Sequence, residues 1–212
     1  MAKARGKRGV VSKSGPVKRD PDATKAALLK SALTLFERHG YDATSVQQIV
    51  ENADRTKGAF YHYYESKEDL LHELHDTFID DQLERARAVL ARDEPADVLL
   101  ADMVTEVLME PLGRYKSEIS VYLQEQRFFS EEAFEEIRAK RDEFESLVVQ
   151  VVERGIEEGV FKDLGPARLI AFGVIGMCAW SHTWLTTGAG KATPHEIGEM
   201  FGQILVSGLK AT

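Results

Sequence analysis

The chain of 212 residues lacks the features expected of a secreted or membrane-spanning protein. Its single cysteine, Cys178, excludes an intrachain disulfide and fits a reducing compartment such as the cytoplasm. Because this cysteine lies in an apolar run, a small buried side chain is expected there. The basic N-terminus has no apolar segment after it, so we expect no secretory signal. The longest apolar run, 169–180, is too short to cross a bilayer, so we expect no membrane association.

Motifs of catalysis and cofactor binding are also absent. The sequence contains no H-E-x-x-H pair, no glycine-rich phosphate loop and no nucleophile elbow. His72, His75 and Asp76, with His62 nearby, suggest a metal cluster, but histidines three residues apart on an acidic helix more often face solvent. We therefore expect no enzyme, no cofactor and no metal site, and a metal-induced switch stays an alternative.

Charge is distributed unevenly along the chain, whose formal net charge is −8. Residues 1–19 hold seven basic side chains and no acidic one, and residues 20–67 are close to balance. Residues 68–212 carry 28 acidic and 14 basic side chains. Because phosphates respond to local charge, the acidic average does not exclude nucleic-acid binding by the N-terminal part. The first 19 residues should be a disordered basic arm, either a solubilising tail or a DNA-contacting segment.

Apolar residues recur at helical spacing from residue 20 onward, with no β-alternation and no internal repeat. The pattern predicts an all-α fold of about nine helices. The expected helices begin near Asp20 or Asp22 and run to Gly40, and then span 44–53, 56–63, 66–91, 95–110, 114–127, 130–158, 166–186 and 194–209. Pro111 to Gly113 should interrupt the fifth of these.

Capping residues mark several of the expected helix starts. Thr44 with Gln47 three residues later reads as a capping box, and Ser66 with Asp69 reads as another. Thr193-Pro194-His195-Glu196 combines a cap, a proline at the first position and an acid at the third. The start of the last helix is therefore the most clearly marked of all.

The stretch 44–71 is the most informative part of the sequence, because it predicts two short helices, a tight turn and a third helix. In a helix-turn-helix protein the second helix of the pair enters the major groove and the first braces the DNA backbone. Thr44 and Ser45 would offer a hydroxyl and backbone N–H groups to a phosphate, Lys57 would reach a guanine, and Lys67 would add a phosphate contact. The candidate DNA-binding residues are Thr44, Ser45, Gln47, Arg55, Thr56, Lys57, Gly58, Ala59, Tyr61, His62, Tyr63 and Lys67.

The alternative is that the tyrosines belong to the core and the charges to a solvated face. Phe60 and Tyr64 lie four residues apart and are expected in the core. Tyr61 and Tyr63 cannot all face inward with them on a helix this short. We therefore divide the chain into the arm 1–19, a helix-turn-helix domain 20–67 and a second domain 68–212.

This stretch resembles the N-terminal domain of the TetR family of transcriptional regulators. The family pattern is matched by Thr44, Ile49, Ala53, Thr56, Gly58, Tyr61, Tyr63, Tyr64, Lys67, Leu70 and Leu71. The chain departs from it at Val50, and at Asp54 and Arg55, where Gly-Val is usual. Asp54 is expected to take the left-handed turn conformation, and Arg55 either snorkels or joins the DNA contacts.

The resemblance implies a homodimer that binds palindromic operator DNA and is released by a small effector. The dimer would form through helices 166–186 and 194–209, and the effector would occupy a pocket in 68–212. Candidate pocket residues are Phe78, Met103, Val107, Tyr122, Phe128, Phe129, Phe144, Met177, Trp180, His182 and Trp184.

The effector itself is expected to be apolar or amphipathic. Ser-His-Thr-Trp at 181–184 weakly resembles family members that respond to acyl-CoA thioesters, whose phosphates would meet Arg127, Arg138 and Arg141. These arginines are equally well explained as partners of neighbouring glutamates. A drug-responsive repressor with an aromatic pocket and a non-enzymatic helical interaction protein are the alternatives.

Overall fold

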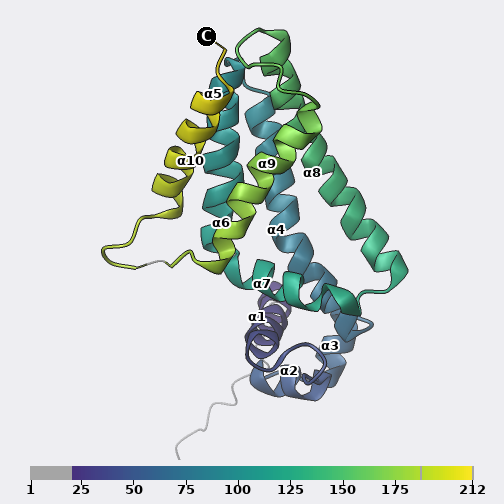
Figure 1. Cartoon of the computed structure of the whole chain (residues 1–212). Coiled ribbons are helices and arrows are strands. Elements are labelled where there is room, and N and C mark those ends of the chain that lie inside the picture. The colour runs from purple at the N-terminus through teal and green to yellow at the C-terminus, as the bar shows by residue number, and fades with distance from the viewer. Residues whose placement is uncertain (1–20, 187, 212) are drawn as a thin grey trace, which may run out of the picture.

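The computed structural model describes residues 21–186 and 188–211, which fold into helices joined by turns and loops (Figure 1). The helices are α1 (Pro21–His39), α2 (Val46–Asn52), α3 (Lys57–Tyr63), α4 (Lys67–Leu90), α5 (Ala96–Asp102), a π-helix (Met103–Met109), α6 (Glu110–Arg114), α7 (Lys116–Glu125), α8 (Glu131–Glu157), α9 (Ala167–Ala179) and α10 (Pro194–Leu209), with 3-10 turns at Gln126–Phe128 and Trp180–Thr183. The expected all-α class is confirmed. The basic arm 1–19 lies outside the described residues. Among those described, no helix is long and apolar enough to cross a membrane.

Two apolar cores organise the molecule. The small core is built by α1, α2, α3 and the first turns of α4, with Leu28, Phe36, Ile49 and Phe60 among its buried members. The large core fills the space between α4, α5, the π-helix, α8, α9 and α10. Figure 1 shows α1–α3 gathered at one end, α4 rising from them through the body, and α7 lying across the junction.

Local sequence signals account for most helix ends. Ser66 and Asp69 form the expected capping box of α4, and Thr193 and Glu196 form that of α10. Gly40 and Gly159 follow α1 and α8 with φ of 80° and 71°, a region that glycine enters at little cost. The expected cap of α2 was wrong: the N-cap is Ser45, which forms its capping box with Gln48.

The segment after α4 differs from expectation. Pro111 does not interrupt the helix, which continues from α5 through the π-helix into α6 and breaks only at Tyr115. A proline is tolerated near a helix start, and the change of hydrogen-bond register from the π-helix to α6 places Pro111 at such a position. Counting α5, the π-helix and α6 as one rod, the described residues form nine helical rods, as the sequence predicted.

The helix expected at 166–186 is shorter in the structure and ends at Ala179. The Nδ1 atom of His182 lies 2.8 Å from the Ala179 carbonyl oxygen, and the Thr183 hydroxyl donates to the Trp180 carbonyl. These contacts occupy the acceptors that a continuing α-helix would use. A 3-10 turn therefore follows α9.

Candidate nucleic-acid interface and ligand cavity

The small core fixes the position of α3. Phe60 and Tyr64 are both buried, as expected, and the Phe60 ring packs 5.5 Å from that of Tyr64. Thr56 caps the helix by accepting the backbone N–H of Ala59 at 3.1 Å. With one face held against α1 and α2, the opposite face of α3 is directed outward at the end of the molecule farthest from the C-terminus (Figure 1).

The turn between α2 and α3 tolerates its unusual sequence. Asp54 has a φ of 52°, so an aspartate occupies the left-handed conformation as expected. The Arg55 guanidinium folds back and donates to the carbonyl oxygens of Ala53 and Asp54, at 3.4 and 2.8 Å. Of the two outcomes considered for Arg55, its local contacts favour a side chain that folds onto its own turn.

An outward face, here called the reading face, is formed by α2 and α3. Lys57 and His62 are exposed on it, and Tyr61 is 56% exposed. Lys57 has no ion-pair partner among the described residues. Gln47 is exposed on α2, where its amide donates to Glu51. Thr56 and Gly58 are also exposed there, whereas Ala59 is half-buried and Tyr63 is half-buried and packs against the small core.

Two candidate phosphate contacts are engaged inside the protein. Thr44 is buried, and its hydroxyl donates to the Gly40 carbonyl at 2.8 Å. The Lys67 ammonium donates to the carbonyl oxygens of Tyr41 and Thr44, at 2.6 and 2.8 Å. Burial lowers the Lys67 pKa, against the pull of Asp42 and Glu125. In this structure both side chains therefore hold the turn before α2, and Ser45 uses its hydroxyl in the α2 cap.

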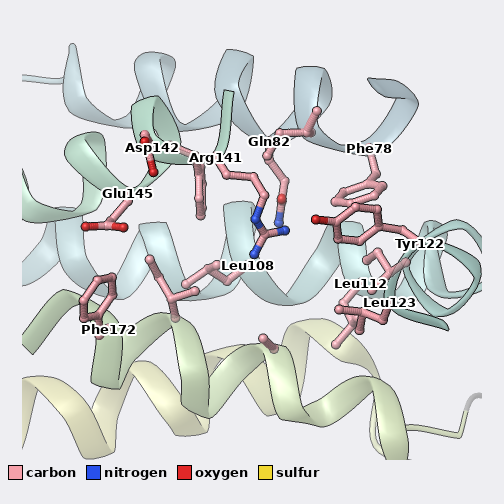
Figure 2. A pocket seen from close by; sticks show the side chains of 15 residues that line it. Phe78, Gln82, Leu108, Leu112, Tyr122, Leu123, Arg141, Asp142, Glu145 and Phe172 are labelled. Carbon is pink, nitrogen blue, oxygen red and sulfur yellow. The ribbon is translucent and has the colours of Figure 1, made fainter. Parts of the chain in front are cut away.

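A cavity of about 270 Å³, here called the inner cavity, lies in the body between α4, α7, α8 and α9. Figure 2 shows the Arg141 and Gln82 side chains reaching into it beside the Tyr122 hydroxyl. Most of its walls are aliphatic or aromatic. The lining residues are Phe78, Ile79, Gln82, Leu108, Leu112, Ile119, Tyr122, Leu123, Arg141, Asp142, Phe144, Glu145, Phe172, Ile175 and Ala179.

The structure brings three of the expected pocket residues to this cavity: Phe78, Tyr122 and Phe144. Met103 and Val107 are fully buried in the large core, and Met177 is half-buried on α9. Phe128 stacks on Tyr41, and Phe129 packs near Tyr122. Three others lie around the 3-10 turn after α9, where the side chains of Trp180 and Trp184 are exposed and His182 contacts the Ala179 carbonyl.

Aromatic and methionine content alone did not separate core positions from cavity positions. The cavity residues that were missed are aliphatic or polar, such as Gln82, Leu112 and Ile175. Their signal is three-dimensional, because they come from helices far apart in sequence that converge on one space.

Arg141 is the only cationic side chain that lines the inner cavity. Its guanidinium lies 5.5 Å from the centre of the Tyr122 ring and has no ion-pair partner among the described residues. It also lines a neighbouring depression of about 360 Å³, here called the outer groove, together with Arg138. Arg138 pairs with Glu135 at 3.3 Å, and Arg127 lies 4.0 Å from Glu125. Arg141 is therefore the arginine best placed to meet a bound anion.

The histidine cluster does not have the exposure expected of it. His75 is fully buried and His72 is half-buried, so neither simply faces solvent. The apolar residues that α7 and α8 pack onto α4 account for this, since the His75 ring stacks on Tyr122 at 4.6 Å. Burial lowers the His75 pKa. Within the described residues no group of three or more metal-ligating side chains is placed to hold a metal.

An exposed apolar face runs along α9 and α10. Leu169 and Phe172 on α9 are exposed, as are Trp180 in the 3-10 turn that follows and Met200 and Ile204 on α10. Gly173 and Gly176 of α9 face open space, because a Cβ atom at either position would meet nothing within 4 Å. Small residues beside exposed apolar ones allow two helices to approach closely, so this face suits a partner helix.

The fold and the reading face define a helical protein with an N-terminal helix-turn-helix DNA-binding unit. The family model "Bacterial regulatory proteins, tetR family" matches residues 28–74. The model "Tetracyclin repressor-like, C-terminal domain" matches residues 93–209, more than half of the chain. The chain therefore belongs to the TetR family of transcriptional regulators, a family of regulators and not of enzymes.

Curated relatives and solved structures are similar to this chain over most of their length. The HTH-type transcriptional repressor KstR2 of Rhodococcus jostii is 29% identical over 184 residues, covering 86% of this chain and 89% of the relative. The structure of the ketosteroid transcriptional regulator KstR2 of Mycobacterium tuberculosis is 25% identical with a TM-score of 0.79, covering 94% of this chain and 99% of that one. The structure of AibR in complex with isovaleryl coenzyme A and operator DNA shares the fold, with 21% identity and a TM-score of 0.71 over 88% of this chain and 98% of that one.

Proposed function

We propose that this protein is a homodimeric transcriptional repressor that binds a palindromic operator through α3 and is released by an amphipathic, anionic effector. Operator DNA and a small-molecule effector are the partners of TetR-type repressors, which bind DNA as dimers. We propose the cytoplasm as its site of action, because operator DNA would be its partner there. The residues proposed to contact DNA are those exposed on the reading face, with Lys57 and Tyr61 at its centre.

The observation that carries the effector class is Arg141, an exposed guanidinium without an ion-pair partner among the described residues, at a mostly apolar cavity whose wall also holds Asp142 and Glu145, the latter paired with Arg168. A guanidinium pairs well with carboxylate and phosphate oxygens, because its planar N–H groups can bond both oxygens at once. The inner cavity, at about 270 Å³, is small beside the roughly 300–1,000 Å³ of most ligand pockets. It suits a compact acyl or ring system, while the outer groove, with Arg138 and Arg141, suits the charged remainder.

An acyl-CoA thioester has this division between an apolar acyl group and a phosphate-bearing carrier. The KstR2 relatives are described as repressors, one of them as a ketosteroid regulator, and AibR was solved with isovaleryl coenzyme A. These descriptions support an apolar moiety and a CoA-linked effector for this chain as well. A drug-responsive repressor is the second candidate, because a cavity with Tyr122 and Phe144 would also receive a neutral aromatic compound.

The test compares effectors that differ only in charge. Octanoyl-CoA, octanoate and 1-octanol are titrated into the complex of the full-length protein with an operator selected from a random duplex library. We expect release by octanoyl-CoA and not by 1-octanol, and a loss of response of roughly tenfold or more in Arg141→Met, since an ion-paired hydrogen bond contributes about 1.5–3 kcal/mol. Arg114→Met, at an exposed position that lines neither site, is the matched control. Release by the alcohol with equal potency would favour the drug-responsive alternative.

Switching would occur by a shift between two dimer conformations that hold the reading faces at different spacings. Helix α4 is one route, because it lines the cavity with Phe78 and Gln82 and contributes Leu70 and Leu71 to the small core. Effector-bound protein that holds its operator as tightly as free protein would contradict this mechanism.

A further inference from the structure

The short helix α7 contacts both cores of the molecule through consecutive residues. Val121 is buried in the small core, among the side chains of α1 to α4. Tyr122, the next residue, lines the inner cavity and packs against the rings of His75 and Phe78. A shift of α7 caused by a molecule in the cavity would therefore also displace side chains of the small core at the DNA-binding end.

Glu125 lies one turn farther along α7 and is bonded to the N-terminal end of the molecule. Its side chain is almost fully buried, and its Oε1 atom accepts the backbone N–H of Tyr41 at 3.1 Å. The same oxygen would lie 3.3 Å from a Cβ atom placed on Gly40, so the turn after α1 passes close to it. Burying a carboxylate without hydrogen bonds costs free energy. The bond to the Tyr41 N–H therefore fixes where the Glu125 carboxylate lies.

The segment that Glu125 holds leads directly into the reading face. The Tyr41 carbonyl accepts the Thr44 N–H at 3.1 Å, and Lys67 bonds both of those residues from the start of α4. The Tyr41 ring also stacks on Phe128, just after α7, at 4.9 Å. Tyr41 thus joins three elements: α7, the start of α4 and the turn that opens α2.

We propose that Glu125 is a positioning residue that couples occupancy of the inner cavity to the orientation of α2 and α3, by a route through α7 that is additional to α4. This inference rests on the proposed function for its purpose, but the mechanical link it describes exists without effector or operator. Movement of Tyr122 displaces the last turn of α7, Glu125 carries the displacement to the Tyr41 amide, and the α2 start follows.

The test is the hydrogen-exchange rate of the Tyr41 backbone amide, measured by NMR on the full-length dimer. Glu125→Ala removes the acceptor and should raise the rate by roughly tenfold or more, while Glu125→Gln keeps an oxygen there and should restore protection. Tyr122→Leu, which loosens α7 at the cavity, should also raise the rate by a few-fold. Phe161→Leu changes a buried ring of the large core outside the cavity and is the matched control, with the Tyr41 rate unchanged.

The decisive comparison is the double variant. If Glu125 carries the coupling, Tyr122→Leu has no further effect on the Tyr41 amide in the Glu125→Ala background. A Tyr41 amide that exchanges equally fast in wild type and Glu125→Ala, or that ignores Tyr122→Leu, would overturn the proposal. Because no operator or effector is present, such a result leaves the proposed function standing. Conversely, failure to bind any operator or acyl-CoA would overturn the proposed function and leave this coupling intact.

Discussion

The Lys67 ammonium lies 3.9 Å from the centre of the Tyr41 ring and donates to the Tyr41 carbonyl at 2.6 Å. The same ammonium also donates to the Thr44 carbonyl. The lysine at the start of α4 therefore stabilises the turn between α1 and α2. Burial raises the pKa of the Tyr41 hydroxyl to about 12, with help from Glu68 and Asp69. The Tyr41 ring is therefore neutral, and the Lys67 ammonium above it joins α4 to the turn that leads into the reading face.

Replacing Lys67 is expected to weaken the fold more than a surface lysine would. Lys67→Met leaves two carbonyl oxygens without this donor, and the free energy of unfolding should fall by about 1–3 kcal/mol. Lys57→Met, at an exposed position, should change it by less than about 0.5 kcal/mol. Urea unfolding of the two variants measures the difference. Equal stability would show that the bonds to Tyr41 and Thr44 contribute nothing.

The turn between α2 and α3 depends on a residue that accepts positive φ. Asp54→Gly should be neutral or slightly stabilising, because glycine enters this region freely. Asp54→Val should lower the free energy of unfolding by about 1–2 kcal/mol, since a branched side chain is strained there. Asp93→Val, in an exposed loop with ordinary φ, is the matched control. Thermal unfolding in which both valine variants lose the same stability would contradict the backbone argument.

His75 is expected to make the body sensitive to acid. Burial lowers the pKa of His75 below the ordinary value of 6.5. Below pH 6.5 the histidine is therefore protonated in the unfolded chain while it is still neutral in the folded chain. The free energy of unfolding should therefore fall as the pH drops from about 6.5 toward the lowered value, and this loss is absent above it. Asp76 acts against the shift, whereas Arg141 and His72 reinforce it.

The measurement is the melting temperature of wild type and of His75→Phe between pH 7.5 and pH 5. The phenylalanine variant should lose less stability over this range, because the aromatic contacts to Phe78 and Tyr122 are kept and the titrating group is gone. His62→Phe, on the exposed reading face, should follow the wild-type profile. Parallel profiles for wild type and His75→Phe would assign the acid sensitivity to other groups.

Helix positions were largely predictable because they depend on local signals. Caps such as Ser66 with Asp69, and stops such as Gly40, act within a few residues of themselves. The errors arose where neighbouring residues compete: Ser45, not Thr44, caps α2, because Thr44 is drawn inward to the Gly40 carbonyl. Pro111 was misread because the π-helix before it is set by packing against α10, whose Gly198 sits on Thr105.

The reading face and the inner cavity differ in the same way, because one depends on local sequence and the other on contacts between distant segments. The reading face was predictable, since Lys57 and Tyr61 sit on a short helix whose opposite side, with Phe60, must be buried. The inner cavity was not, because its walls come from α4, the π-helix, α6, α7, α8 and α9, and no sequence window contains them. The turn-holding role of Lys67 was hidden for the same reason, since its partners lie 26 and 23 residues away.

Helix α3 presents a proposed DNA-binding surface at Lys57 and Tyr61, and operator affinity over a range of salt concentrations tests this surface most directly. We expect Lys57→Ala and Tyr61→Ala each to weaken binding by about 1–3 kcal/mol, roughly tenfold or more, with unchanged melting temperatures, and a lost phosphate contact to reduce the salt dependence by about one unit of slope. Lys162→Ala, beside the C-terminal end of α10, should bind as wild type. Wild-type affinity and salt dependence in both α3 variants would contradict the account.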